Sequence, residues 1–161
     1  MIKIFILLVM IISANAQAEK KEYNVLINNI ILGKISDFST INNGYLVAKP
    51  TNFLVKLFTS FDNYIIYEEN KKPHIQGDNK YKKDKYLLLS IVRELIKNRP
   101  EYKLIDGPKY KLIVKCKDDK CTYERIHKKS NTSNFGYLNF ENNIFDEIYD
   151  EKSQASFKRV Q

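Results

Sequence analysis

Short alternating stretches of apolar and polar residues dominate this chain, and such a period of two is typical of half-buried β-strands. The clearest stretch is residues 110–125, where apolar residues alternate with lysines up to Cys116 and the alternation resumes at Cys121. Between the two cysteines lies the four-residue polar loop 117–120. A hairpin with this loop places Cys116 directly opposite Cys121, close enough for a disulfide.

Similar patterns, separated by turn residues, predict further strands along the rest of the chain. Asn28-Asn29, Asn42-Asn43-Gly44 and Asp106-Gly107-Pro108 are typical turn sequences. Gly33 lies inside one of the stretches and indicates a bulge or a close packing contact. The predicted strands are 23–27, 30–38, 45–49, 63–69, 102–105, 136–140 and 155–160, with 144–149 as a strand or a helical turn.

One segment, residues 85–98, has the period of a long amphipathic helix. Its apolar stripe consists of Leu88, Ile91, Val92, Leu95 and Ile96. Asp84 stands at the N-cap, and Pro100 prevents continuation. Lys97 and Arg99 are expected in the last turn, where they complement the helix dipole.

The sequence pattern does not decide the structure of three segments. The apolar residues of 53–61 fit a helical stripe or a short strand followed by a loop. Residues 74–76 suit a short partner strand. Residues 77–85 are the most polar stretch; they suit a basic patch with an interleaved tyrosine or a solvated loop that leads into the helix, and we favour the loop.

Together these elements predict a mainly β protein of the α+β class. We expect a single strongly curved antiparallel sheet or open β-barrel, with the long amphipathic helix packed on its concave side. The turns between neighbouring strands are short, and this favours an antiparallel arrangement.

The first 18 residues predict export. Lys3 is the only charge in residues 1–18, an unbroken apolar run covers 4–12, and Ala16-Gln17-Ala18 resembles a signal-peptidase site. The apolar run is too short to span a bilayer. We therefore expect a signal peptide at 1–18, a single globular domain at 19–161, a periplasmic or secreted location, and an oxidising environment for the cysteines.

The charge of the chain is basic, with 27 Lys and Arg against 19 Asp and Glu and a net charge of +8. Nearly all of the cations are lysines, and Lys, Asn and Ile are used heavily together, which is typical of an AT-rich genome. A nucleic-acid reader more often uses arginine for its bidentate fork. The composition therefore disfavours nucleic acid as a partner.

The motifs of common enzymes and metal sites are missing from the sequence. The two histidines, His74 and His127, have no metal-ligand spacing, and no Gly-x-Ser-x-Gly, phosphate-binding loop or dinucleotide motif occurs. We expect no catalytic residue, metal or cofactor. The adjacent acids Glu68-Glu69, Asp118-Asp119 and Asp150-Glu151 are interpreted as solvated turn residues.

A candidate anion-binding set remains. Arg125 shares a strand face with Cys121 and Tyr123, so it is expected to point inward. There it pairs with a buried acid, the interpretation we favour, or binds an anionic head group. The strand tyrosines either line a pocket or fill the core, and the core is favoured. The candidate set is Lys80, Lys82, Lys83, Lys85 and Arg125.

The layout resembles a family of exported bacterial proteins of unknown function. The similar features are Tyr23-x-Val25 with Gly33 soon after, the apolar helix 87–95, and Asp106-Gly107 followed by Tyr110-x-Leu112. The resemblance implies a largely antiparallel β domain behind a signal peptide, and a periplasmic setting. It implies no reaction.

The leading hypothesis is therefore a non-enzymatic periplasmic protein that binds an envelope lipid, a polymer or an envelope protein. The alternative is a secreted enzyme or binding module that acts on a polyanion, with His127, Arg125 and residues 80–85 in the site. Simple anion binding by the lysines is a third possibility. The oligomeric state is not predicted by the sequence.

Overall fold

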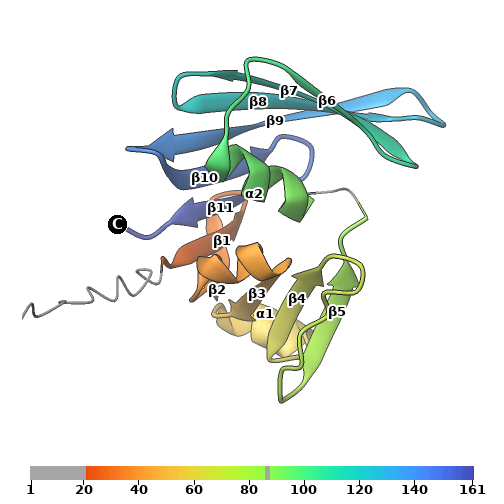
Figure 1. Ribbon diagram of the computed structural model, residues 1–161. Helices are drawn as coiled ribbons and strands as arrows, with labels where there is room; N and C mark the ends of the chain where they lie inside the picture. The colour runs from red at the N-terminus through yellow and green to blue at the C-terminus, as the bar shows by residue number, and fades with distance from the viewer. Residues whose placement is uncertain (1–20, 86–87) are drawn as a thin grey trace, which may run out of the picture.

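The computed structural model describes residues 21–85 and 88–161, and these residues form one open sheet of 11 strands with three short helices (Figure 1). The predicted signal peptide and its cleavage site lie outside the described residues. The strand order is β5-β4-β3-β2-β1-β11-β10-β9-β8-β7-β6. The strands are β1 (Tyr23–Ile27), β2 (Ile30–Ile35), β3 (Tyr45–Pro50), β4 (Asn63–Tyr67), β5 (Asn79–Lys83), β6 (Lys103–Asp106), β7 (Tyr110–Lys117), β8 (Lys120–His127), β9 (Thr132–Glu141), β10 (Ile144–Asp150) and β11 (Ala155–Arg159).

The mainly β class is confirmed, but the sheet is mixed rather than purely antiparallel. The exception is β5, which pairs with β4 in parallel. It lies within residues 77–85, so the interpretation of that segment as a loop was wrong. An edge strand forms backbone hydrogen bonds with a partner strand on one side only, and exposed lysines at an edge discourage pairing with other chains. Residues 74–76, by contrast, are not a strand.

The sheet is also not closed into a barrel. Its two edge strands, β5 and β6, stand at opposite ends of the strand order among the described residues. Between β2 and β3 only two residue pairs join the strands, Gly33 with Pro50 and Lys34 with Lys49. Figure 1 shows that β3–β5 turn away from β7–β9 beyond this narrow junction. The sheet therefore bends at a corner instead of closing.

Gly33 makes this corner possible. A Cβ at residue 33 would lie 2.8 Å from the carbonyl oxygen of Lys49, closer than any side chain tolerates. The register between β1 and β2 shifts at Val25/Leu26, opposite the same glycine. The predicted bulge and close contact at Gly33 are both confirmed, because a strand that must turn sharply needs a residue without a side chain.

The helix α2 (Leu88–Lys97) fills the corner and forms the core with both parts of the sheet. Leu89, Val92 and Leu95 are almost completely buried. They share one cluster with Leu46 of β3 and Leu138 of β9. The helix is shorter than the predicted 85–98: Lys85 precedes it, and residues 86–87 lie outside the described residues. Asp84 does accept a hydrogen bond from the Leu89 backbone N–H at 2.8 Å.

Two further helices lie between strands. The 3₁₀ helix η1 (Phe38–Asn43) replaces the end of the predicted strand 30–38 and ends at Gly44, whose φ is 81°. Within 53–61, α1 (Phe53–Phe58) settles the choice between helix and strand. The Asn52 side chain caps α1 by accepting a hydrogen bond from the Leu54 N–H.

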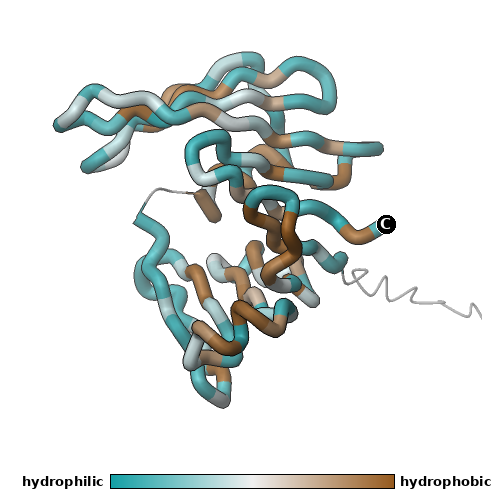
Figure 2. The backbone as a smooth tube through the Cα atoms, turned by 180° about the vertical axis from the view of Figure 1, so that it is seen from behind, coloured by the Kyte–Doolittle hydropathy of each residue, from teal (hydrophilic) through white to brown (hydrophobic). Residues whose placement is uncertain are grey.

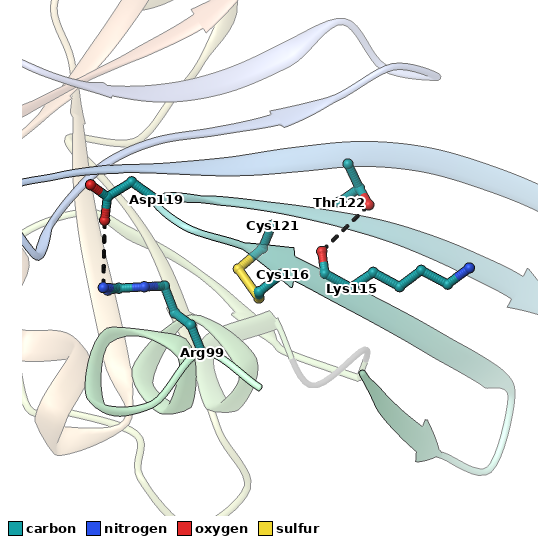
Figure 3. Close-up of a disulfide and its surroundings, with 6 residues drawn as sticks. All are labelled: Arg99, Lys115, Cys116, Asp119, Cys121 and Thr122. Atoms are coloured by element: carbon teal, nitrogen blue, oxygen red, sulfur yellow. Dashed lines mark hydrogen bonds and ion pairs between the residues drawn. A yellow bond between two sulfur atoms is a disulfide. The ribbon is translucent and has the colours of Figure 1, made fainter. Parts of the chain in front are cut away.

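The cystine hairpin is formed as predicted, with Cys116 paired to Cys121 across β7 and β8 and their sulfur atoms at bonding distance (Figure 3). The predicted four-residue loop is shorter: Lys117 pairs with Lys120, and only Asp118 and Asp119 form the turn. Asp118 adopts a positive φ of 52°, which short polar residues tolerate well enough to close a two-residue turn.

Arg99 joins this hairpin to the end of α2 instead of completing the last helical turn. Its guanidinium lies 3.5 Å from the Asp119 carboxylate (Figure 3). The centre of the Phe140 ring is 4.7 Å from the same group. The helix ends at Lys97, so Arg99 is free of helical geometry and can reach across to the sheet.

We expect the paired substitution Cys116→Ser, Cys121→Ser to leave a folded protein whose thermal midpoint is only a few degrees lower. The disulfide closes a very short loop, and such a loop removes little entropy from the unfolded chain, about 2 kcal/mol at most. Circular dichroism melting of the variant measures the shift. Thiol labelling of the unreduced wild type after denaturation checks the bond itself, and two free thiols per chain would contradict it.

Candidate functional site

A cavity of about 610 Å³ lies at the corner of the sheet, beside the N-terminal end of α2. Its walls come from both parts of the sheet and from the segment that joins β5 to α2. Most of the lining is apolar, and this size is ordinary for a small-molecule site, which typically has about 300–1,000 Å³. The apolar lining residues are Ile66, Leu88, Ile91, Leu112, Leu138, Ile148, Ala155 and Phe157.

One end of the cavity is polar and centres on the Asp150 carboxylate. Its Oδ2 accepts hydrogen bonds from Asn134 Nδ2 at 2.7 Å and from the Tyr123 hydroxyl at 3.2 Å. Arg125 lies 3.5 Å from the same oxygen. Oδ1 accepts from the backbone N–H and the hydroxyl of Ser153 at 2.9 and 2.7 Å. The carboxylate thus connects β8, β9, β10 and the turn after β10.

These contacts decide the protonation of the polar end. Burial alone raises the pKa of Asp150, but the two Ser153 hydrogen bonds and the Arg125 charge outweigh it, and the pKa is lower than that of an ordinary aspartate. Burial raises the pKa of Tyr123, and the Asp150 charge raises it further. At neutral pH a neutral tyrosine therefore donates to an ionised carboxylate.

Gly136 provides the space for Tyr123. The two residues are direct neighbours across β8 and β9. A Cβ at residue 136 would lie 2.4 Å from the Tyr123 ring and 2.2 Å from the Tyr149 carbonyl oxygen. The hydroxyl end of the Tyr123 ring therefore occupies the space that a side chain at residue 136 would need.

The cavity carries an excess of positive charge. Four lysines and one arginine line it, against the two carboxylates of Asp84 and Asp150. The lining lysines are Lys82, Lys83, Lys85 and Lys152. Lys83 also forms an ion pair with Glu69 at 2.5 Å. An anion at this rim would meet cations from the β5–α2 segment on one side and from the turn after β10 on the other.

Four of the five residues of the candidate anion-binding set therefore meet at the cavity. The exception is Lys80, whose ammonium lies 5.5 Å from the centre of the Phe61 ring and outside the lining. Successive side chains of a strand point to opposite faces, yet both Lys82 and Lys83 line the cavity. They are the last two residues of β5. Arg125 points inward and pairs with an acid, as the favoured interpretation held.

His127 does not line the cavity. Its Nδ1 lies 2.8 Å from the Ser130 hydroxyl and 3.1 Å from the Ser130 backbone N–H, within the turn that follows β8. Its ring contacts Tyr110 edge-on, at 4.9 Å between centres. The arrangement fits a residue that shapes a turn.

The sequence reasoning missed Asp150 and Lys152. It interpreted the pair Asp150-Glu151 as solvated, yet Asp150 accepts hydrogen bonds from Asn134, Tyr123 and Ser153. The signal available was Asp150-x-x-Ser153, because an aspartate often accepts hydrogen bonds from a residue two or three positions ahead in a turn. The alignment of β10 with β9 and β8, which brings Asn134 and Tyr123 to it, cannot be read from that motif.

The chemistry available at the cavity is the solvation of apolar groups and the attraction of anions. Within residues 21–85 and 88–161, no group of three or more His, Cys, Asp and Glu side chains gathers as a metal site would require. None of the described helices has the length and apolar character needed to cross a bilayer.

No protein-family model, curated protein sequence or solved structure matches this chain.

Proposed function

We propose that this protein is an exported, non-enzymatic binding protein of the periplasm or the extracellular space, and that its ligand is an amphipathic anion. A molecule with one acyl chain and a negatively charged head group, such as a single-chain envelope lipid, has the required chemistry. The observation that carries the proposal is the cavity at the sheet corner, which has apolar walls and a cationic rim.

The apolar walls supply the driving force. The floor of the cavity consists of Leu112, Leu138 and Ile148, and side chains of the sheet do not fill the space above it. Leu88 and Ile91 of α2 face this floor. Each methylene that leaves water for such walls gains about 0.8 kcal/mol, which is about fourfold in affinity. An acyl chain therefore uses this space better than a sugar or a nucleotide would.

The charged rim supplies the orientation. The rim includes Lys82 and Lys83 at the end of β5 and Lys85 just after this strand. Lys152 reaches the rim from the turn after β10. Arg125 is partly neutralised by Asp150, so the lysines provide most of the uncompensated charge. A head group at this rim remains in contact with water while its chain is buried.

The test is a binding series with alkyl sulfates of increasing chain length, measured by displacement of the fluorescent fatty acid cis-parinaric acid. Affinity is expected to rise about fourfold per methylene until the cavity is full. Native mass spectrometry of protein purified from the periplasm provides an independent check for a retained lipid.

The control separates the cavity lysines from general basicity. We expect the triple substitution to glutamine at Lys82, Lys83 and Lys85 to weaken binding about tenfold, because exposed cations contribute up to about 1 kcal/mol each. The same change at Lys111, Lys115 and Lys117, three exposed lysines of β7 outside the cavity, removes equal charge and should have little effect.

Two results would overturn the proposal. One is the absence of any binding in the series together with repeated recovery of an empty protein. The other is an affinity that does not change with chain length. Combined with retention on heparin that falls steeply with salt, the second result would favour the polyanion-binding alternative, for which the exposed Lys80 and Lys82 of β5 are the candidates.

A further inference from the structure

A second surface, outside the lining of the cavity, exposes large apolar side chains. The helix α1 has no buried residue. Phe53, Leu54, Leu57 and Phe58 are between 61% and 88% exposed, and only Val55 of the helix is half-buried. A surface helix normally turns its apolar stripe toward the core, whereas α1 leaves four of its five apolar side chains exposed. In Figure 1 it lies at the end of the sheet remote from the cystine hairpin.

The neighbouring strand enlarges this apolar surface. The backbone N–H of Thr51 donates to the Leu32 carbonyl at 3.0 Å, and the Asn52 side chain donates to the Ile31 carbonyl at 3.4 Å. The start of α1 is therefore fastened to β2, where Ile30 and Ile31 are 57% and 45% exposed. We call the set Ile30, Ile31, Phe53, Leu54, Leu57 and Phe58 the α1 surface.

Contiguous apolar exposure of this kind marks a protein or membrane contact, because single exposed residues are common but clusters of them are rare. Seen from behind in Figure 2, the tube at this end of the molecule includes hydrophobic stretches beside hydrophilic ones. The exposed aromatic and leucine side chains project from one short, capped helix. A flat lipid surface can receive such a projection without a shaped partner.

The charge around the α1 surface favours an anionic membrane. Residues 38–61, which include α1, contain Lys49 and Lys56 and no acidic residue, and Asp37 and Asp62 stand immediately beyond the two ends of this segment. The chain as a whole has a net charge of +8. Phe and Leu on one side with Lys beside them is the composition of segments that lie in a membrane interface. An acidic protein partner would match the charge but would also need an apolar groove of its own.

We propose that the α1 surface docks this protein on the surface of an anionic lipid bilayer, with Phe53, Leu54, Leu57 and Phe58 inserted among the acyl chains. The lysines near α1 contact the head groups. The chain then binds the membrane from one side and does not cross it. This inference is independent of the cavity and its ligand.

The experiment is flotation of the full-length mature protein with unilamellar vesicles of phosphatidylglycerol and phosphatidylcholine in equal amounts. The wild type is expected to float with these vesicles and to float less with pure phosphatidylcholine. The double substitution Phe53→Ser, Phe58→Ser should lower the vesicle partition coefficient about tenfold or more, because two large apolar side chains no longer leave water.

A matched control removes similar apolar area elsewhere. Leu104 and Phe135 are 51% and 47% exposed but lie on β6 and β9, so Leu104→Ser, Phe135→Ser should leave the partition coefficient unchanged. Both double variants should keep the thermal midpoint of the wild type. If the first pair does not fold, Leu54→Ser, Leu57→Ser tests the same surface. Binding of cis-parinaric acid should be unaltered, which separates this proposal from the cavity.

Three outcomes would overturn the proposal: no flotation of the wild type, an equal loss in the α1 pair and the control pair, or a stable dimer in sedimentation velocity that the Phe53→Ser, Phe58→Ser variant loses. The last result would show that a second copy of the chain covers the α1 surface.

Discussion

Replacement of Gly136 by alanine is expected to destabilise the protein by about 3 kcal/mol, the upper end of the usual cost of overpacking. The added Cβ would lie 2.2 Å from the Tyr149 carbonyl oxygen, which belongs to the backbone and can move only if β10 moves. It would also meet the Tyr123 ring at 2.4 Å. Urea denaturation of wild type and variant measures the difference in free energy of unfolding.

A second variant identifies the source of this cost. In a Tyr123→Ala background the ring is gone, but the Tyr149 carbonyl remains, so the added methyl group should cost less without becoming neutral. The displaced ring should also disturb the polar end of the cavity, because the Tyr123 hydroxyl donates to Asp150. A cost below about 0.5 kcal/mol for Gly136→Ala, the range of surface substitutions, would contradict the packing described here.

Replacement of Asp150 by asparagine is expected to cost about 2 kcal/mol at pH 7, because donors that now meet a carboxylate would lose a charged acceptor. Asn134, Tyr123 and Ser153 all donate to this side chain. Asparagine keeps the shape of the side chain, but its NH₂ group would face the donors that now meet one of the two carboxylate oxygens. Those donors would then lack an acceptor.

The effect of Asp150→Asn should depend on pH in a defined direction. The pKa of Asp150 is lowered in the folded protein, so the folded state holds fewer protons on this residue than the unfolded state does near pH 4. Its stabilising contribution is complete above the unfolded pKa of about 3.9 and is lost as the pH falls through the folded value. The difference between wild type and variant should therefore be smaller at pH 3 than at pH 7.

Asp106→Asn provides the control. Asp106 is an exposed acid whose pKa is lowered mainly by its hydrogen bond with Lys128. Because solvent screens such a pair, its removal should have a much smaller effect at either pH. Equal losses for the two variants at pH 7 would mean that Asp150 is no more important than a surface ion pair.

The local elements of this protein were predicted best where one residue or one short motif decides the structure. Asn28 and Asn29 adopt the positive φ angles expected of their turn. The register of β7 and β8 follows from the alternation around the cysteines. In each case the interactions involved are close in sequence, so the pattern contains the information needed.

Predictions failed where contacts distant in sequence determine the structure. Nothing in the lysine-rich residues 77–85 indicates a strand, because β5 is stabilised by parallel pairing with β4 at the sheet edge. The exposure of most apolar residues of α1 goes with its attachment to β2 through Thr51 and Asn52. Burial of a side chain depends on what the rest of the chain places beside it.

The sequence by itself determined the mainly β class, the cystine hairpin, the apolar helix and the inward direction of Arg125, because each depends on local periodicity or on a short turn. Only the tertiary structure decided that the sheet bends at Gly33 and stays open, that a cavity remains beside α2, and that Asp150 joins Asn134, Tyr123 and Arg125. These features depend on how eleven strands align over the whole chain, and a local pattern of apolar and polar residues does not specify which distant strands become neighbours.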